Sequence, residues 1–434
     1  MVHRLAAYVL SISSGRGAGA LSGKCTAAVE PVGEVSLTGT MNTHRLRAAV
    51  LSMLGVLVLG ACGTLPRGTA PIRLADTALS RGVDPRLNLE DAAAREALGA
   101  AMDRAVRAHG QASTILAISG GGADGAYGAG VLTGWSERGD RPAFDLVTGV
   151  STGALTAPFA FLGSDWDDEL RAAYTGGQTE GLVSWRSLSA LTAPSLLSPR
   201  ILSDLVNTHV TPELLRRVAE EHARGRRLLV VTTNLDAEAA VVWDMGQIAT
   251  QGDANALALF REVLLASASI PGVFPPVLIA TVQTDGTIVR GMHVDGGVTV
   301  PFLASPGGPV TAALERSGRD NGAAGRVFII INGQAERQYA VTSGRISAIL
   351  GRAYITSSKA ATARELAAAV TFAGANHLDL FITDIPTEAE SSSLDFDQAA
   401  MTSLFELGHL RGLEGDAWRA PRAGEAGGEG VPVE

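Results

Sequence analysis

The sequence predicts an α/β fold, with a mostly parallel central sheet sandwiched between helices. Short apolar segments rich in β-branched residues alternate along the chain with longer segments of helical periodicity, and this alternation is typical of βαβ units. Hydrophobic residues make up 46% and charged residues 18% of the 434 residues, which is ample material for a buried core and excludes a disordered chain.

The expected strands are apolar runs that stop at glycines or polar turns. The run at 114–118 reads TILAI and is followed by glycines, and the run at 327–331 reads VFIII. A short run at 241–243 is expected to form a hairpin with the strand before it. In chain order the expected strands are 114–118, 144–148, 227–233, 288–294, 327–331 and 378–383.

The expected helices show apolar residues every three to four positions. The first has Asn88 as a candidate N-cap and Gly110 just beyond its end. Several further helices are expected between 165 and 225. In chain order the other expected helices are 89–109, 126–138, 154–162, 256–267 and 396–413.

The N-terminal part contains a predicted export signal. Arg45 and Arg47 precede an apolar run at 48–61, and Cys62 follows. The run is shorter than the roughly 20 residues that span a bilayer, which disfavours a transmembrane anchor. The sequence LGAC that ends at Cys62 is similar to the lipobox of bacterial lipoproteins. That similarity implies lipidation of Cys62 and a membrane-anchored protein of the bacterial cell envelope, facing the periplasm or the exterior.

This interpretation divides the first part of the chain into three segments. Residues 1–40 are expected to be a spurious extension upstream of Met41, and residues 41–61 a lipoprotein signal peptide. Residues 62–112 are expected to form a tether and an N-terminal helix.

Charge and cysteine content exclude several function classes. The net charge is -9 and no basic stripe is present, which argues against nucleic acid as a partner. The only cysteines are Cys25 and Cys62, which excludes a disulfide framework and a cysteine-rich metal site. No histidine pair has metalloprotease spacing, so we expect no metal and no cofactor.

Three glycine-containing clusters follow expected strands. The first, GVSTG, runs from Gly149 to Gly153 between a strand and a helix and is typical of a nucleophile elbow that exposes Ser151. The glycines relieve crowding at the sharp turn, and the helix N-terminus favours developing negative charge.

The second cluster, GGGADG, contains Gly120, Gly121, Gly122 and Gly125. Successive backbone N–H groups of such a run can point into one cavity and form an oxyanion hole. The cluster also matches the dinucleotide fingerprint, but the expected acidic partner, Asp140, precedes a strand instead of ending one. A nicotinamide-binding function and a simple tight turn are the weaker alternatives.

The third cluster is Asp295, Gly296 and Gly297. A serine nucleophile needs a base and a stabilised oxyanion, and Asp295 could act as that base directly. A carboxylate is a weak base for a hydroxyl, so this chemistry requires a site that excludes water.

Taken together, the clusters resemble the patatin-like phospholipase family. The resemblance rests on GGGADG at 120–125, GVSTG at 149–153, ASASIPGVFPP at 266–276 and DGG at 295–297, with VTTNLDAEAAVVWD at 231–244 similar to the family's central strand pair.

The resemblance implies a metal-independent hydrolase of fatty-acyl esters in lipids, of the phospholipase, lipase or esterase type. It assigns Ser151 and Asp295 to a catalytic dyad without histidine, and Gly120, Gly121 and Gly122 to the oxyanion hole. It implies a catalytic domain at 114–302, which strands and helices at 303–419 complete. The Gly/Glu-rich composition of residues 420–434 predicts a disordered tail.

Several alternatives remain open. Asp124 stands where the family usually carries arginine or lysine. It is expected either to disfavour anionic lipids or to point to solvent, and the second expectation is preferred. His293, His377 or His409 could complete a conventional triad. The same acyl-enzyme could serve an acyl transferase, and an inactive lipid-binding scaffold is a further alternative. The oligomeric state is left undecided.

Overall fold

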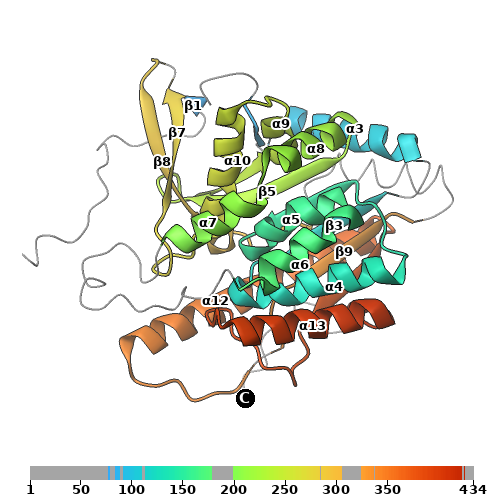
Figure 1. The fold of residues 1–434 in the computed structure, drawn as a ribbon, viewed down its shortest axis with the longest axis vertical. Helices are drawn as coiled ribbons and strands as arrows, with labels where there is room; N and C mark the ends of the chain where they lie inside the picture. The colour runs from blue at the N-terminus through green and yellow to red at the C-terminus, as the bar shows by residue number, and fades with distance from the viewer. Residues whose placement is uncertain are drawn as a thin grey trace, which may run out of the picture. The chain divides into compact units, whose positions relative to one another are not determined.

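The computed structural model describes residues 77–78, 84–87, 91–109, 113–177, 199–283, 285–304, 324–336, 338–422 and 425, and it confirms the expected fold class. A mixed, ten-stranded sheet is flanked by helices (Figure 1). The strands are β1 (Thr77–Ala78), β2 (Arg86–Leu87), β3 (Thr114–Ile118), β4 (Leu146–Val150), β5 (Arg227–Asn234), β6 (Ala239–Asp244), β7 (Val277–Gln283), β8 (Ile288–Asp295), β9 (Arg326–Ile331) and β10 (Asp379–Asp384).

The centre of the sheet is parallel and one side of it is antiparallel. Strands β10, β9, β3, β4 and β5 are neighbours in that order and run in the same direction. Strand β8 then pairs with β5 in the opposite direction, and β7 pairs antiparallel with β8. The short β6 returns antiparallel along β5, as the expected hairpin requires. Fully buried β3 and β4 have no polar face, as expected of strands covered on both sides.

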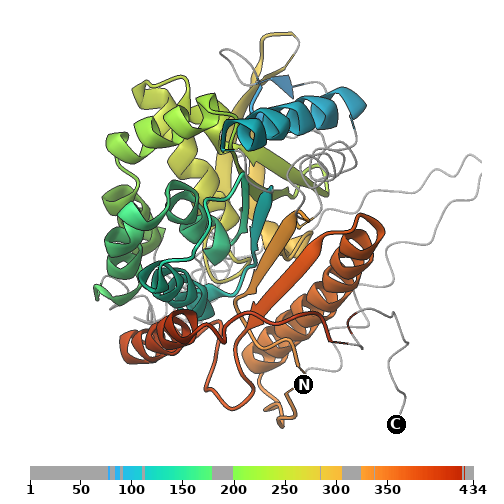
Figure 2. The same ribbon diagram turned by 90° about the vertical axis from the view of Figure 1, so that its right-hand side faces the viewer.

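Helices cover both faces of the sheet and enclose two hydrophobic clusters (Figure 2). Helices α3 and α12 pack on one face through residues such as Met102 and Leu366. The other helices pack on the opposite face through residues such as Phe159, Phe260 and Phe405. The helices are α3 (Ala92–His109), α4 (Gly125–Arg138), α5 (Thr152–Leu162), α6 (Asp167–Thr175), α7 (Pro199–His209), α8 (Pro212–Ala223), α9 (Met245–Ala249), α10 (Ala254–Ser267), α12 (Ile346–Ala375) and α13 (Gln398–Glu414).

The expected elements are found within a few residues of their sequence-based limits, and two large elements are additional. Strand β7 and the 30-residue helix α12 were not expected from the sequence. Within the expected tether at 62–112, β1 and β2 each add a two-residue strand to the sheet. The expected signal peptide at 41–61 and Cys62 lie outside the described residues. In the part of the chain that the structure describes, no helix has the length and apolarity needed to cross a membrane.

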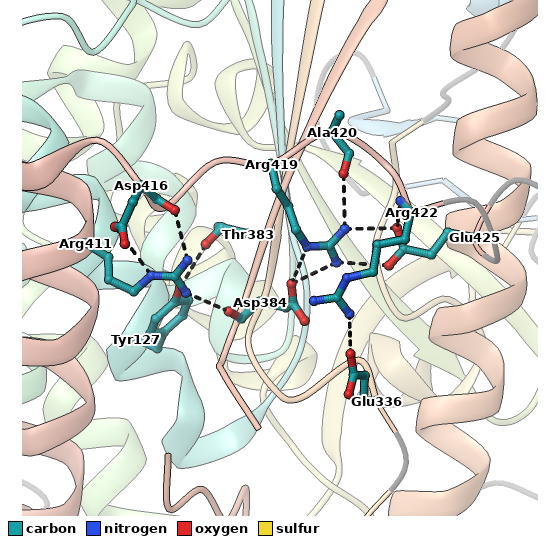
Figure 3. Close-up of polar contacts among 10 residues, drawn as sticks. All are labelled: Tyr127, Glu336, Thr383, Asp384, Arg411, Asp416, Arg419, Ala420, Arg422 and Glu425. Carbon is teal, nitrogen blue, oxygen red and sulfur yellow. Dashed lines mark hydrogen bonds and ion pairs between the residues drawn. The ribbon is translucent and has the colours of Figure 1, made fainter. Parts of the chain in front are cut away.

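The residues after α13 are held beside β10 by ion pairs (Figure 3). Arg419 lies 2.8 Å from Asp384 and 2.9 Å from Glu425, and Arg422 lies 2.7 Å from Glu336. The sequence predicts disorder from residue 420 onward, whereas Arg422 and Glu425 take part in this network. Residues 423–424 and 426–434 lie outside the described part.

Helices α4 and α13 cross in backbone contact because glycines face each other at the crossing. A Cβ atom on Gly134 would lie 2.0 Å from the carbonyl oxygen of His409, and one on Gly408 would lie 2.2 Å from that of Tyr127. Gly130 and Gly412 are equally close to the opposite backbone. Neither helix can accept a side chain at these positions without moving, so the crossing fixes α4, which follows the glycine loop.

We expect Gly134→Ala to destabilise the fold, because the added methyl group would overlap the His409 carbonyl oxygen. The free energy of unfolding should fall by about 1–3 kcal/mol in urea titrations. Gly374→Ala is the matched control, since Gly374 is an exposed helical glycine with no atom within 4 Å of an added Cβ. That change should raise the stability by up to about 1 kcal/mol. Equal unfolding midpoints for the two variants would contradict the close crossing.

Candidate active site

Ser151 lies at a strained turn between β4 and α5. Its backbone has φ 56° and ψ −126°, a conformation that residues with a side chain rarely adopt. The flanking glycines make the turn possible: a Cβ on Gly149 would lie 2.5 Å from the carbonyl oxygen of Gly153, and one on Gly153 would lie 2.4 Å from that of Ile118. The turn therefore holds the Ser151 side chain at the end of the central sheet, at the N-terminus of α5.

Asp295 reaches Ser151 because two strands end against the same edge of β5. Val150 at the end of β4 pairs with Val231, and Asp295 at the end of β8 pairs with the next residue, Thr232. Strand β6 occupies the other edge of β5 at both positions, so β4 and β8 meet end to end. The Ser151 Oγ donates a hydrogen bond of 2.5 Å to Asp295 Oδ2. Both side chains are buried, Asp295 completely.

The C-terminal end of α10 and the residues that follow it hold both strand ends in place. Ser267 Oγ accepts a hydrogen bond of 3.0 Å from the Ser151 N–H and donates one of 2.7 Å to the Val231 carbonyl oxygen. The Asp295 N–H donates to the carbonyl oxygen of Ser269 at 3.0 Å. These contacts give the ASASIPG segment a positioning role that the resemblance implied only in outline.

Burial raises the pKa of Asp295 from 3.8 to about 7. The hydrogen bonds from Ser151 and from the Gly297 N–H, at 2.7 Å, oppose that effect because both favour the charged form. Tyr354 on α12 is also affected: burial, and then the charge of Asp295, raise the pKa of its hydroxyl. The carboxyl group therefore changes its protonation state near neutral pH.

The glycine loop after β3 faces Ser151. A Cβ on Gly120 would lie 3.1 Å from that of Ser151, but the Gly120 N–H already donates to the Pro301 carbonyl oxygen at 3.2 Å. Among the described residues, no acceptor is bonded to the N–H groups of Gly121 and Gly122. Gly122 has φ +57°, which favours glycine. The structure thus brings all three expected glycines to the site and leaves two of their N–H groups available.

Asn332, which sequence analysis missed, fixes the shape of this loop. Its Nδ2 donates to the Ser119 carbonyl oxygen at 2.9 Å, and its Oδ1 accepts from the Gly128 N–H at 3.2 Å. The Asn332 backbone N–H donates to Ser119 Oγ at 2.9 Å. The available signal was position alone, because Asn332 directly follows the strand VFIII.

Asp124 does not point to solvent, so that preferred expectation is wrong. Its carboxylate is buried and accepts hydrogen bonds from Ser391 Oγ at 3.2 Å and from the Ser392 N–H at 3.0 Å. Burial raises the pKa of Asp124 to about 7, against the opposing effect of these two bonds.

The histidines lie away from the Ser151–Asp295 pair. His293 is buried, and its ring nitrogens contact Thr232 Oγ1 at 2.9 Å and Asn234 Nδ2 at 3.2 Å. Burial lowers the pKa of His293 to about 4, so the ring is neutral. His409 on α13 contacts Glu137 on α4 at 2.9 Å, and His377 follows the C-terminus of α12. The geometry therefore does not support the triad alternative.

Two cavities meet at Ser151. The larger, of about 280 Å³, is bounded by polar and apolar groups of the glycine loop, α12 and the loop at 391–393. We call it the polar cavity because the ionisable side chains of Asp124, Arg352 and Lys359 line it. The smaller, of about 70 Å³, is almost entirely apolar. Ser151, Gly122 and Ile270 line both cavities. A molecule bound at Ser151 could therefore place a polar part on one side and an apolar part on the other.

Three remaining expected glycines pack around the dyad. A Cβ on Gly125 would lie 2.1 Å from Thr152 Oγ1, one on Gly296 would lie 2.3 Å from the Val231 carbonyl oxygen, and one on Gly297 would lie 3.0 Å from Asp295 Oδ1.

Across the described ranges, no cluster of three or more histidine, cysteine or acidic side chains could hold a metal ion.

Comparisons with known proteins gave one family match and one similar solved structure that we report here. Residues 116–305 match the family model described as "Patatin-like phospholipase". None of the curated proteins matches the sequence. A solved structure, VipD from Legionella pneumophila, is 14% identical with a TM-score of 0.34, over 72% of this chain and 68% of that chain. Residues 116–305 are thus similar in sequence to patatin-like phospholipases.

Proposed function

We propose that the protein is a serine hydrolase that cleaves fatty-acyl ester bonds of lipids, with Ser151 as nucleophile and Asp295 as its base. The observation that carries this proposal is the 2.5 Å hydrogen bond between the two side chains. It lies where a polar and an apolar cavity meet, at a serine held in a strained conformation. The patatin-like domain supports lipid acyl hydrolysis as the general class of activity.

In the first half of the reaction, Ser151 Oγ attacks the ester carbonyl carbon while Asp295 accepts the hydroxyl proton. The carbonyl oxygen becomes negatively charged and accepts hydrogen bonds from the N–H groups of Gly121 and Gly122, next to the N-terminus of α5. The intermediate then collapses: the bond to the leaving alkoxide breaks, and Asp295 returns the proton to it. An acyl-enzyme and a free alcohol result.

In the second half, water attacks the acyl carbonyl and gives a proton to Asp295. Collapse of the second tetrahedral intermediate breaks the bond to Ser151 Oγ, which regains the proton from Asp295. A fatty acid leaves. The raised pKa suits Asp295 to both steps, because a group with a pKa of about 7 can accept and return a proton near neutral pH.

The apolar cavity suits the acyl chain. Leu155, Phe159, Leu205 and Phe274 line it, and it opens at Ser151. Methylene groups next to the ester carbonyl would be desolvated there, which contributes about 0.8 kcal/mol for each buried group.

We also propose that the protein is exported to the cell envelope and anchored by a lipid on Cys62. The basic residues before the apolar run at 48–61 and the LGAC sequence support this proposal.

Removal of either member of the dyad should abolish ester hydrolysis. We expect Ser151→Ala and Asp295→Asn to lower kcat/KM for p-nitrophenyl butyrate by at least about 1,000-fold. Circular dichroism and urea unfolding would establish that both variants fold. His293→Gln is the control, because the His293 ring contacts Thr232 and Asn234 instead of the dyad. Retained activity in Asp295→Asn, with loss in His293→Gln, would restore the triad alternative.

The activity should rise with pH through about 7. Asp295 must be unprotonated to accept the serine proton, so kcat/KM should fall about tenfold for each pH unit below its pKa and level off above it. Hydrolysis of p-nitrophenyl butyrate, followed at a wavelength where both forms of the product absorb equally, measures this profile. Asp124 titrates in the same range, so Asp124→Asn is the control. If kcat/KM of Asp124→Asn no longer decreased at low pH, the titration of Asp124 instead of Asp295 would cause that decrease.

Cys62 should carry the lipid. In a bacterial expression host, the full-length chain should incorporate labelled palmitate and fractionate with membranes, whereas Cys62→Ser should incorporate none. Cys25→Ser is the matched control, because Cys25 precedes the expected cleavage site. Mass spectrometry of the mature protein should show a modified N-terminal Cys62. An unprocessed N-terminus with equal labelling of all variants would reject the lipoprotein proposal.

A further inference from the structure

Helix α12 forms one wall of the polar cavity. Arg352, Ile355, Lys359 and Thr362 recur every three or four residues and all line the cavity, so they share one face of the helix. The opposite wall is the glycine loop with Ser151 and Asp124. The helix lies outside residues 116–305, which match the family model.

This face brings two cations into the cavity. Arg352 donates a hydrogen bond of 2.5 Å to the Gln338 carbonyl oxygen, and Lys359 donates one of 2.8 Å to that of Glu336. Both bonds are to neutral carbonyl groups. Within the described residues, neither cation has a carboxylate within ion-pair distance. The Glu336 carboxylate instead pairs with Arg422 (Figure 3).

The carboxyl groups across the cavity form no ion pair with these cations, although Asp124 and Lys359 attract each other across it. Asp295 is bonded to Ser151 and Gly297, and Asp124 is bonded to Ser391 and Ser392. Burial raises the pKa of both carboxyl groups to about 7, so each is only partly charged at neutral pH.

The two cations also repel each other. Burial, and then the charge of Arg352, lower the pKa of Lys359, and the charge of Asp124 across the cavity acts in the opposite direction without cancelling them. A bound anion would relieve this repulsion. Arginine and lysine together are well suited to a phosphate group, since the guanidinium can donate two parallel hydrogen bonds.

We propose that Arg352 and Lys359 form a subsite for a phosphate-bearing head group of the lipid substrate. This assignment rests on the proposed function, because the ester carbonyl must lie at Ser151. The acyl chain then occupies the apolar cavity and the head group extends into the polar cavity toward α12. The subsite makes the enzyme selective for anionic over neutral acylglycerols, contrary to the selectivity that Asp124 alone suggested.

The test compares two substrates that differ only in the phosphate. Phosphatidic acid and diacylglycerol with identical acyl chains are presented in mixed micelles of a non-ionic detergent. We expect the full-length protein to prefer phosphatidic acid, and Arg352→Met/Lys359→Met to lower the ratio of the two kcat/KM values by at least about tenfold. Methionine keeps the length of the side chains while removing the charge.

A second double variant controls for general attraction to an anionic surface. Arg345 precedes α12 and Arg364 lies on it; both are exposed, and neither lines the cavity. Arg345→Met/Arg364→Met removes the same charge from the same region. Its ratio of kcat/KM for phosphatidic acid to kcat/KM for diacylglycerol should stay within about twofold of the ratio for the unsubstituted protein. An equal loss of selectivity in both double variants would overturn the subsite and leave only surface attraction.

A binding measurement separates the subsite from the reaction. Calorimetry on Ser151→Ala should detect glycerol 3-phosphate, with at least about tenfold weaker binding when Arg352 and Lys359 are also replaced. If no variant hydrolyses any ester but this difference holds, the proposed function fails and the anion site stands. If inorganic phosphate binds as tightly and the lipid selectivity is absent, the site takes free phosphate and the head-group assignment is wrong. No difference in binding overturns the site itself.

Discussion

The site depends on the end-to-end meeting of β4 and β8 on one edge of β5. A parallel strand and an antiparallel strand cannot both continue along that edge, so their ends must face each other between Val231 and Thr232. This places two residues from distant parts of the sequence at hydrogen-bond distance without a long side chain to bridge them. Ser267 then joins β4 to β5 through two hydrogen bonds, and the absence of a side chain on Gly296 allows β8 to approach the β5 backbone.

This arrangement lowers the stability of the folded state and favours the proposed reaction. Burial raises the pKa of Asp295 above its unfolded value, so the folded state binds more protons than the unfolded state between about pH 4 and 7. The stability associated with this group therefore decreases as pH rises through that range. Above pH 7 the fold retains a charged, buried carboxylate together with the strained Ser151 backbone. In the proposed reaction, both features hold the base and the nucleophile close to the reacting geometry, so that little reorganisation is needed.

Local patterns explain which features could be predicted from the sequence. Ser151, Asp295 and the glycine loop lie in short motifs at strand ends, and sheet topology brings strand ends together. Asn332 and the environment of Asp124 depend on contacts between residues far apart in the sequence: Ser392 lies 268 positions from Asp124. The expectation for Asp124 failed for this reason. Helix α12 was missed because its Ala-rich sequence has no strong apolar stripe, although its C-terminal half packs on the sheet through Leu366, Ala369 and Ala373.

The features in local motifs and the features that depend on distant contacts also have different roles at the site. The segment that matches the family model holds the proposed nucleophile, the proposed base and the proposed oxyanion donors at strand ends. The polar cavity is completed by α12 and the loop at 391–393, which lie outside that segment. The ion pairs after α13 extend this second part, because Arg422 pairs with the Glu336 carboxylate (Figure 3). The Glu336 carbonyl oxygen in turn accepts a hydrogen bond from Lys359. Under the proposed function, substitutions on α12 therefore change which head group fits without moving the Ser151 and Asp295 side chains.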